Sequence, residues 1–147
     1  METNLKFNSA ICTSRSQSER LLALGLKKET ADMVHCIKTR NHLGDEIERH
    51  SYYSFGTEVD ERPLGYANYE HFPAWSLGRL IEMMPEEIDR YFCTSFLILS
   101  KHNVYYNESV DGAPDMEFEK NNLFESILNC IEWLIKEGYF NNEYLEE

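Results

Sequence analysis

The sequence predicts an α+β fold, in which an antiparallel sheet of about four strands carries two to three helices packed mainly on one face. Two observations predict this class: apolar residues recur at helical spacing in three segments, and apolar or alternating runs typical of strands lie between them. The length of 147 residues and a hydrophobic content of 42% suffice for one core, so we expect a single globular domain over 1–147. The expected helices lie near 15–24, 76–84 and 122–137.

The first expected helix has signals at both of its ends. Several residues are possible caps, namely Thr13, Ser14, Ser16 and Ser18. Of these, Ser16, with Glu19 three residues later, fits a capping box. Leu21 and Leu22 then give the helix an apolar side, and Gly25 can take the left-handed conformation that often ends a helix.

The region after this helix predicts two strands and a long connection. Residues 33–39 read as a strand, and the aromatic residues at 52–55 suggest a second strand that would pair with it as a hairpin. Residues 57–72 contain Pro63, Gly65 and several charges, so we expect them to be mostly connection.

A short helix is predicted between Pro73 and Pro85. Ser76 is its natural N-cap, and Pro85 cannot continue it without loss of a backbone hydrogen bond. Trp75 precedes the cap and is expected to pack back on the first turn. One stripe of the helix is apolar: Leu77, Leu80, Ile81 and Met84.

The last part of the chain predicts a further helical fragment, two strands and the longest helix. Pro85 and the two glutamates after it suit the first turn of a short helical fragment. Residues 91–100 read as a strand, and its run Phe96-Leu-Ile-Leu99 is apolar on both alternating faces, which predicts a central strand covered on both sides. Residues 104–107 would return beside it. The final helix begins at Asn121 or Asn122 and ends at Gly138.

Charge and hydropathy limit the classes of function that the chain could have. The net charge is −12, and residues 108–147 carry eleven acidic and two basic side chains, a net charge of −9. Such a surface disfavours direct binding to nucleic acid or anionic lipid. No apolar run is long enough to span a membrane, and the N-terminus lacks the features of a signal peptide, so we expect a cytoplasmic protein, monomeric or homodimeric.

No motif in the sequence carries catalytic or metal-binding chemistry. The four cysteines lie far apart, which favours buried thiols in a reducing compartment. His35 and Cys36 are adjacent, so on a strand they would point to opposite faces and would not share a metal ion. A Cys/His pair built on Cys93 or Cys36, or acid–base work by paired carboxylates, remains a weaker alternative. We therefore expect no catalytic residue, metal or cofactor.

A cluster of aromatic residues is the candidate binding feature. Tyrosine joins an apolar ring to a polar end and is enriched at protein interfaces. The alternative is that these side chains line the sheet and the loop that covers it. The candidate partner-binding residues are Tyr52, Tyr53, Tyr66, Tyr69 and Trp75.

Three motifs carry a resemblance to a known group of proteins. They are Thr30-Ala-Asp-Met33, then Pro73-Ala-Trp-Ser-Leu77 with the closing Pro85, and a C-terminal amphipathic helix that ends in Trp-Leu-Ile-Lys-Glu-Gly-Tyr. Together they resemble small, uncharacterised proteins encoded in bacterial prophages and mobile elements, over residues 12–140. The resemblance implies a cytoplasmic accessory protein and no particular activity.

The function that we expect is non-enzymatic: an accessory or adaptor protein that acts by binding an unidentified protein partner. An acidic DNA mimic is the alternative, because the 108–147 segment is rich in carboxylates; it would occupy a host DNA-binding protein. A small hydrolase is the third class. A pull-down from host lysate that returns no partner would count against the first class, and competition with DNA would test the second.

Overall fold

The computed structural model describes residues 10–40, 43, 46–54, 69–90, 93–107, 116–119 and 122–147. These residues contain both helices and antiparallel strands, so the predicted α+β class is confirmed. The helices are α1 (Arg15–Ala23), α2 (Leu77–Met83) and α3 (Leu123–Glu137), with short 3-10 turns at Lys28–Thr30 and Asn142–Tyr144. The strands are β1 (Met33–Arg40), β2 (Glu46–Ser54), β3 (Tyr69–Ala74), β4 (Glu87–Arg90), β5 (Cys93–Leu99), β6 (Asn103–Asn107) and β7 (Met116–Glu119).

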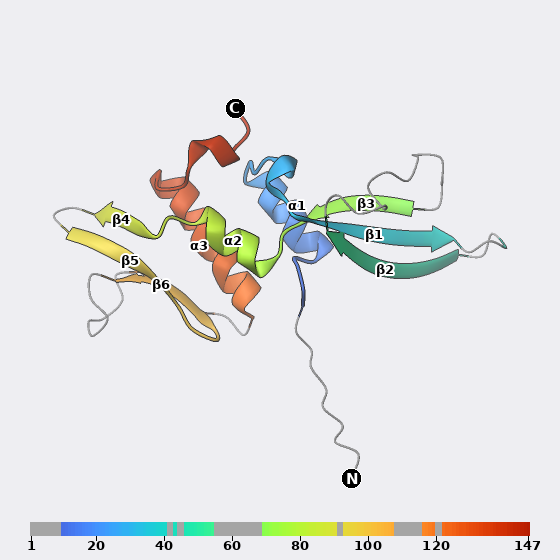
Figure 1. Cartoon of the computed structure of the whole chain (residues 1–147), viewed down its shortest axis with the longest axis horizontal. Helices are drawn as coiled ribbons and strands as arrows, with labels where there is room; N and C mark the ends of the chain where they lie inside the picture. Colours follow the sequence, from blue (N-terminus) through green and yellow to red (C-terminus); the bar gives the residue numbers. More distant parts are fainter. Residues whose placement is uncertain are drawn as a thin grey trace, which may run out of the picture.

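The described strands form two antiparallel sheets, where the sequence predicted one. The strand order is β2-β1-β3 in the first sheet and β4-β5-β6-β7 in the second. The three helices lie between the two sheets (Figure 1). The sheets separate because β3 leads directly into α2, and β4 starts only after Pro85 has ended that helix.

Helix α1 begins at Arg15, as the predicted range 15–24 expects, but its cap lies two residues before the predicted Ser16. The Ser14 side chain accepts a hydrogen bond from the backbone N–H of Gln17, and the Gln17 side chain accepts one from the backbone N–H of Ser14. The capping box is therefore formed by Ser14 and Gln17, and the prediction of Ser16 with Glu19 was wrong. Gly25 has φ of +100°, the left-handed conformation expected after this helix.

The caps predicted for α2 and α3 are confirmed. The Ser76 hydroxyl accepts from the backbone N–H of Arg79, and the Asn122 side chain accepts from that of Phe124. Gly138 ends α3 with φ of +80°. The backbone N–H of Tyr139 then bonds to the carbonyl of Leu134 at 2.8 Å, which pairs one of the carbonyls left over at the helix end.

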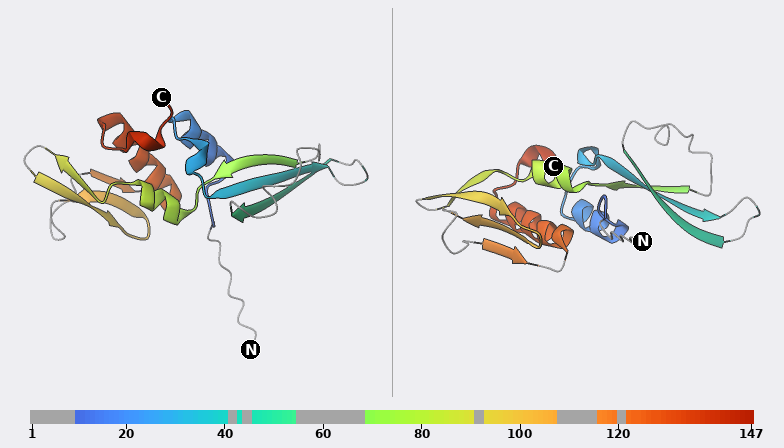
Figure 2. Two further views of the ribbon diagram at one scale, coloured as in Figure 1. Left: turned by 45° about the horizontal axis from the view of Figure 1, so that its top comes forward. Right: turned by 60° about the horizontal axis from the view of Figure 1, so that its bottom comes forward.

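The first sheet is built around β1, which pairs with β2 on one side and with β3 on the other. The predicted hairpin of β1 with β2 is confirmed, whereas β3 begins inside the segment that was predicted to be connection. Pro73 lies within β3, which is possible because, among the described strands, β3 pairs on one side only. The views in Figure 2 show this sheet extending away from the helices, with α1 at its near end.

The second sheet packs one face on the helices. Leu97 and Leu99 of β5 pack against the main core, together with Val104 and Tyr106 of β6. Phe96, on the other face of β5, is 45% exposed, so the prediction that this strand is covered on both sides was wrong. The predicted helical fragment after Pro85 was also wrong, because residues Glu87–Arg90 pair with β5 as strand β4.

The main core lies where α3 meets α1, α2 and the second sheet. Its largest fully buried members are Trp75, Tyr106, Leu21, Leu26, Leu80, Ile127, Leu128, Ile131 and Leu134. Val34, Cys36 and Ile37 of β1 are also buried, but they lie outside this cluster. No helix among the described residues has the length and apolar character needed to cross a membrane.

Candidate functional site

A cavity of about 470 Å³ opens where the segment before α1 meets β2 and the start of α3. Its volume falls within the range of sites that bind small molecules or the side chains of a partner. Segments far apart in the sequence come together here, since the lining residues are Ala10, Ile11, Cys12, Ser14, Gln17, Tyr52 and Asn122. We call this cavity the α1 pocket.

The segment before α1 is held in place by hydrogen bonds to Trp75, which lies between the end of β3 and the cap of α2. The backbone N–H of Thr13 donates to the carbonyl of Trp75 at 2.9 Å, and the backbone N–H of Trp75 donates to the Thr13 hydroxyl at 3.0 Å. The same hydroxyl lies 2.7 Å from that of Ser18 in α1. Thr13 and Ser18 are fully buried, so these bonds fix the path of the chain from Cys12 into α1.

Two apolar side chains stand exposed at the α1 pocket. Ile11 is 59% exposed and Tyr52 is 37% exposed. The ring of Tyr52 stacks on that of His35, with centroids 4.5 Å apart and planes 19° apart. Because β1 and β2 pair His35 with Tyr52, this stacking fixes the direction of the tyrosine at the pocket.

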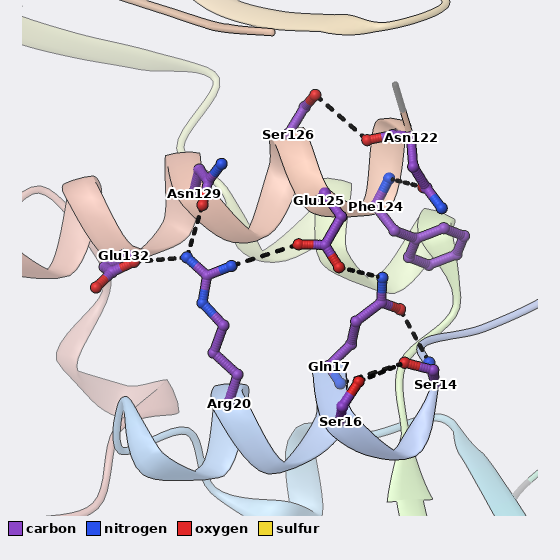
Figure 3. Close-up of polar contacts among 10 residues, drawn as sticks. All are labelled: Ser14, Ser16, Gln17, Arg20, Asn122, Phe124, Glu125, Ser126, Asn129 and Glu132. Atoms are coloured by element: carbon purple, nitrogen blue, oxygen red, sulfur yellow. Dashed lines mark hydrogen bonds and ion pairs between the residues drawn. The ribbon is translucent and has the colours of Figure 1, made fainter. Parts of the chain in front are cut away.

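The polar side chains of the pocket are engaged in the fold: one links α1 to α3, and two cap these helices (Figure 3). Gln17 donates from Nε2 to Glu125 in the first turn of α3 at 2.7 Å. Asn122 uses Oδ1 to cap α3 at 2.8 Å from the backbone nitrogen of Phe124. Ser14 uses Oγ to cap α1. Ile11 and Tyr52 are the large apolar side chains exposed at the pocket, beside the exposed residues Ala10, Ser14 and Asn122.

Arg20 continues the contact between α1 and α3. Its Nη2 lies 2.6 Å from the side-chain oxygen of Asn129 and 2.6 Å from a carboxylate oxygen of Glu132. Its Nη1 lies 3.6 Å from Glu125 (Figure 3). One guanidinium thus links three positions along α3, which holds the two helices, and the pocket between their starts, in one arrangement.

Cys12 is the thiol among the lining residues, and its surroundings keep it protonated. Burial, with a smaller contribution from the charge of Asp32, raises the pKa of the Cys12 thiol to about 11. At neutral pH the thiol is therefore a weak nucleophile. In the part of the chain that the structure describes, no three His, Cys, Asp or Glu side chains gather in a way that would hold a metal ion.

The structure separates the five residues proposed from the sequence. Tyr52 lines the α1 pocket. Trp75 is fully buried in the core, and its indole N–H donates to the Thr30 hydroxyl at 3.0 Å, so its assignment to a binding face was wrong. Tyr53 and Tyr69 belong to β2 and β3, with side chains outside the described part, and Tyr66 lies outside the described residues.

The sequence reasoning missed the other members of the pocket. Ile11 precedes the first expected helix, and no local pattern in that segment indicates a site. Ser14 and Asn122 are recognisable as helix caps, but a cap signal does not show that two helices start beside each other. The contact of Gln17 with Glu125 spans 108 residues, which no local pattern can predict.

Comparison with known proteins does not assign the chain to a family. No family model, no curated protein and no solved structure matches it.

Proposed function

We propose that this chain is a non-enzymatic accessory or adaptor protein of a prophage or mobile element, which acts in the cytoplasm by binding another protein. The observation that carries the proposal is the pair of exposed apolar side chains, Ile11 and Tyr52, at the α1 pocket. The link to mobile elements rests on the sequence motifs alone.

A partner that covers this pair would gain free energy from burial. Removing the side chain of an isoleucine from water is worth about 1.5–3 kcal/mol when the burial is complete. The tyrosine offers a rigid ring that can pack while its hydroxyl stays at the edge of the contact. Because Tyr52 is already stacked on His35, little of its rotational freedom remains to be lost on binding.

The chemistry of the pocket supports binding better than catalysis. The pKa of Cys12 is raised, so a thiolate nucleophile is disfavoured at neutral pH. Gln17 is bonded to α3, and the acceptor oxygens of Ser14 and Asn122 cap helices. A catalytic site would instead direct such groups towards a reacting atom.

The test is a quantitative affinity capture from lysate of the cells that carry the gene, with Ile11→Arg as the disrupting variant. Ile11 is exposed, so the folded structure should tolerate arginine, whereas a partner would have to bury its charge. We expect the recovered amount of at least one captured protein to fall about tenfold with Ile11→Arg. The control Phe96→Ser should recover the same amount of that protein as wild type does. Recovery that is the same from wild type and Ile11→Arg would contradict the role of the pocket.

The acidic DNA mimic receives less support. Two of the carboxylates in residues 108–147, those of Glu125 and Glu132, form ion pairs with Arg20 of α1. A mimic needs carboxylates spaced along a surface as densely as phosphates on a duplex, and paired carboxylates present less of their charge. Competition with duplex DNA for a captured DNA-binding protein would favour the mimic over the adaptor.

A further inference from the structure

The outer face of the second sheet, opposite the helices, has an exposed apolar centre. Side chains alternate along a strand, so Phe96 and Ile98 of β5 point away from the core that Leu97 and Leu99 join. Phe96 is 45% exposed, and Ile98 and its cross-strand partner Tyr105 are partly exposed. Most strand positions that face water are polar, so three neighbouring apolar positions on one face require explanation.

Exposed carboxylates lie along one side of this apolar centre. Strand β4 pairs Glu87 with Phe96 and Asp89 with Thr94, so both acidic residues share the outer face. Asp89 accepts a hydrogen bond from the Thr94 hydroxyl at 2.9 Å, and this bond fixes the direction of its carboxylate. Within the described ranges, neither carboxylate has an ion-pair partner, because the salt bridges there are made by Arg15 and Arg20 in α1.

We propose that this outer face is a second docking surface, which binds a segment of another protein that carries lysine or arginine among apolar residues. The apolar part of such a segment would cover Phe96 and Ile98, and its cations would pair with Glu87 and Asp89. The surface is distinct from the α1 pocket, so the proposal goes beyond the function given above. Two separate surfaces are what an adaptor that joins two partners requires.

Charge decides between this occupant and the others. A second copy of the chain, packed face to face, would bring the carboxylates of Glu87 and Asp89 near those of its partner, with a net charge of −12 on each molecule. Nucleic acid and anionic lipid are disfavoured by the same carboxylates. A cationic segment with apolar residues matches both halves of the surface.

The experiment selects peptides from a random 12-residue display library on the immobilised full-length chain. We expect enriched peptides to combine lysine or arginine with aliphatic or aromatic residues. Enrichment should fall about tenfold on Phe96→Ser, which removes an exposed ring and leaves the core intact. The double variant Glu87→Gln with Asp89→Asn should remove the preference for basic residues.

Two control variants separate this surface from general attraction to an acidic protein. Glu29→Gln with Glu137→Gln removes two exposed carboxylates elsewhere, and Leu43→Ser removes an exposed apolar side chain that neither proposed surface uses. Both controls should keep the enrichment of wild type. Any one of the following results overturns the proposal: no enrichment of peptides, a loss of enrichment in the controls equal to that in Phe96→Ser, or a dimer in sedimentation that Phe96→Ser dissociates. Peptides that depend on Ile11 alone would support the α1 pocket and contradict the second surface.

Discussion

At the scale of single residues, two glycines in helical segments have opposite requirements. Gly138 ends α3 with φ of +80°, and a Cβ there would meet no atom within 4 Å. Gly78 lies in α2 with an ordinary φ, and a Cβ would approach only the Ser76 hydroxyl, at 4.0 Å. In both positions space is available, so the backbone conformation decides the effect of a substitution.

Alanine at these two positions should therefore change stability in opposite directions. Gly138→Ala forces a side chain into the left-handed region and should lower the free energy of unfolding by about 1 kcal/mol. Gly78→Ala replaces a poor helix former and should raise it by up to about 1 kcal/mol. Urea unfolding followed by circular dichroism measures both. An unchanged stability of Gly138→Ala would contradict the assignment of backbone strain to Gly138, and a loss in Gly78→Ala would contradict the space assigned to Gly78.

The buried thiols predict how stability depends on alkaline pH. Burial raises the pKa of Cys130 to about 12 and that of Cys12 to about 11, from an ordinary value of 9.0. Above pH 9 the unfolded chain therefore loses these protons before the folded chain does. The stability contributed by the protonated thiols is complete below pH 9 and is lost as the pH rises towards 11 and 12.

We expect the melting temperature to fall between pH 8 and pH 10.5, and to fall less steeply in Cys130→Ala. The variant removes one of the groups whose ionisation favours the unfolded state. Ile131→Val is the control, because it truncates a neighbouring core side chain that does not titrate. Thermal melts across this pH range give the slopes. Equal slopes in wild type and Cys130→Ala would show that the thiol does not contribute.

At the scale of elements, the contact between α1 and α3 depends on Arg20. Arg20→Gln removes its bonds to Asn129 and Glu132, and we expect the free energy of unfolding to fall by about 1–2 kcal/mol. Arg15→Gln is the matched control, since Arg15 forms exposed ion pairs with Glu19 and Glu70 and should cost under about 1 kcal/mol.

Salt should reveal the difference between the two arginines. In about 1 M salt the charges are screened within about 3 Å, so the cost of Arg20→Gln should shrink but not disappear, because the bond to Asn129 involves a neutral amide. The cost of Arg15→Gln should approach zero. Urea unfolding at low and high salt measures both. Equal costs for the two variants at low salt would contradict a special role for Arg20.

The elements that the sequence predicted are those with strong local signals. The stripe of α3 and the caps at Ser76, Asn122 and Gly138 are local patterns, and all are confirmed. Strand β4 was missed because Pro85 and two glutamates suit a helix start, and only its pairing with β5 makes it a strand. Strand β3 was missed because Pro73 weakens a strand pattern, although an edge strand tolerates it.

The candidate site was predictable to a smaller extent than the fold. Tyr52 was identified from its residue type, and its place at the pocket depends on pairing with His35 across the hairpin. Trp75 has the same aromatic character, yet it is fully buried. Residue type indicates which side chains suit an interface, whereas long-range packing decides which of them reach the surface.

At the scale of the whole molecule, the described residues have two separate regions of burial. The main core joins the three helices to the second sheet. The first sheet buries Val34, Cys36 and Ile37 outside that core, and its link to the helices runs through α1 against β3. The cation of Arg15 over the ring of Phe72, 5.5 Å from its centroid, is part of that link.

This division predicts that the first sheet opens without unfolding the rest. Ile37→Ala and Ile131→Ala remove the same atoms from two buried positions, one in β1 and one in α3. We expect Ile131→Ala to lower the free energy of global unfolding by about 2–5 kcal/mol and to speed amide hydrogen exchange throughout the chain. Ile37→Ala should speed exchange mainly in β1, β2 and β3, because only that sheet loses packing.

Hydrogen exchange followed by mass spectrometry distinguishes the two outcomes peptide by peptide. In wild type, amides of α3 should exchange last, and those of β1 should exchange earlier through local opening. If Ile37→Ala lowers the protection of α3 as much as that of β1, the two regions unfold as one unit and the division is wrong. If protection falls in the first sheet alone, that sheet is the part of the described chain that opens most readily. A partner that binds at Tyr52 of β2 would then stabilise it, and amide exchange in that sheet should be slower in the complex than in the free protein.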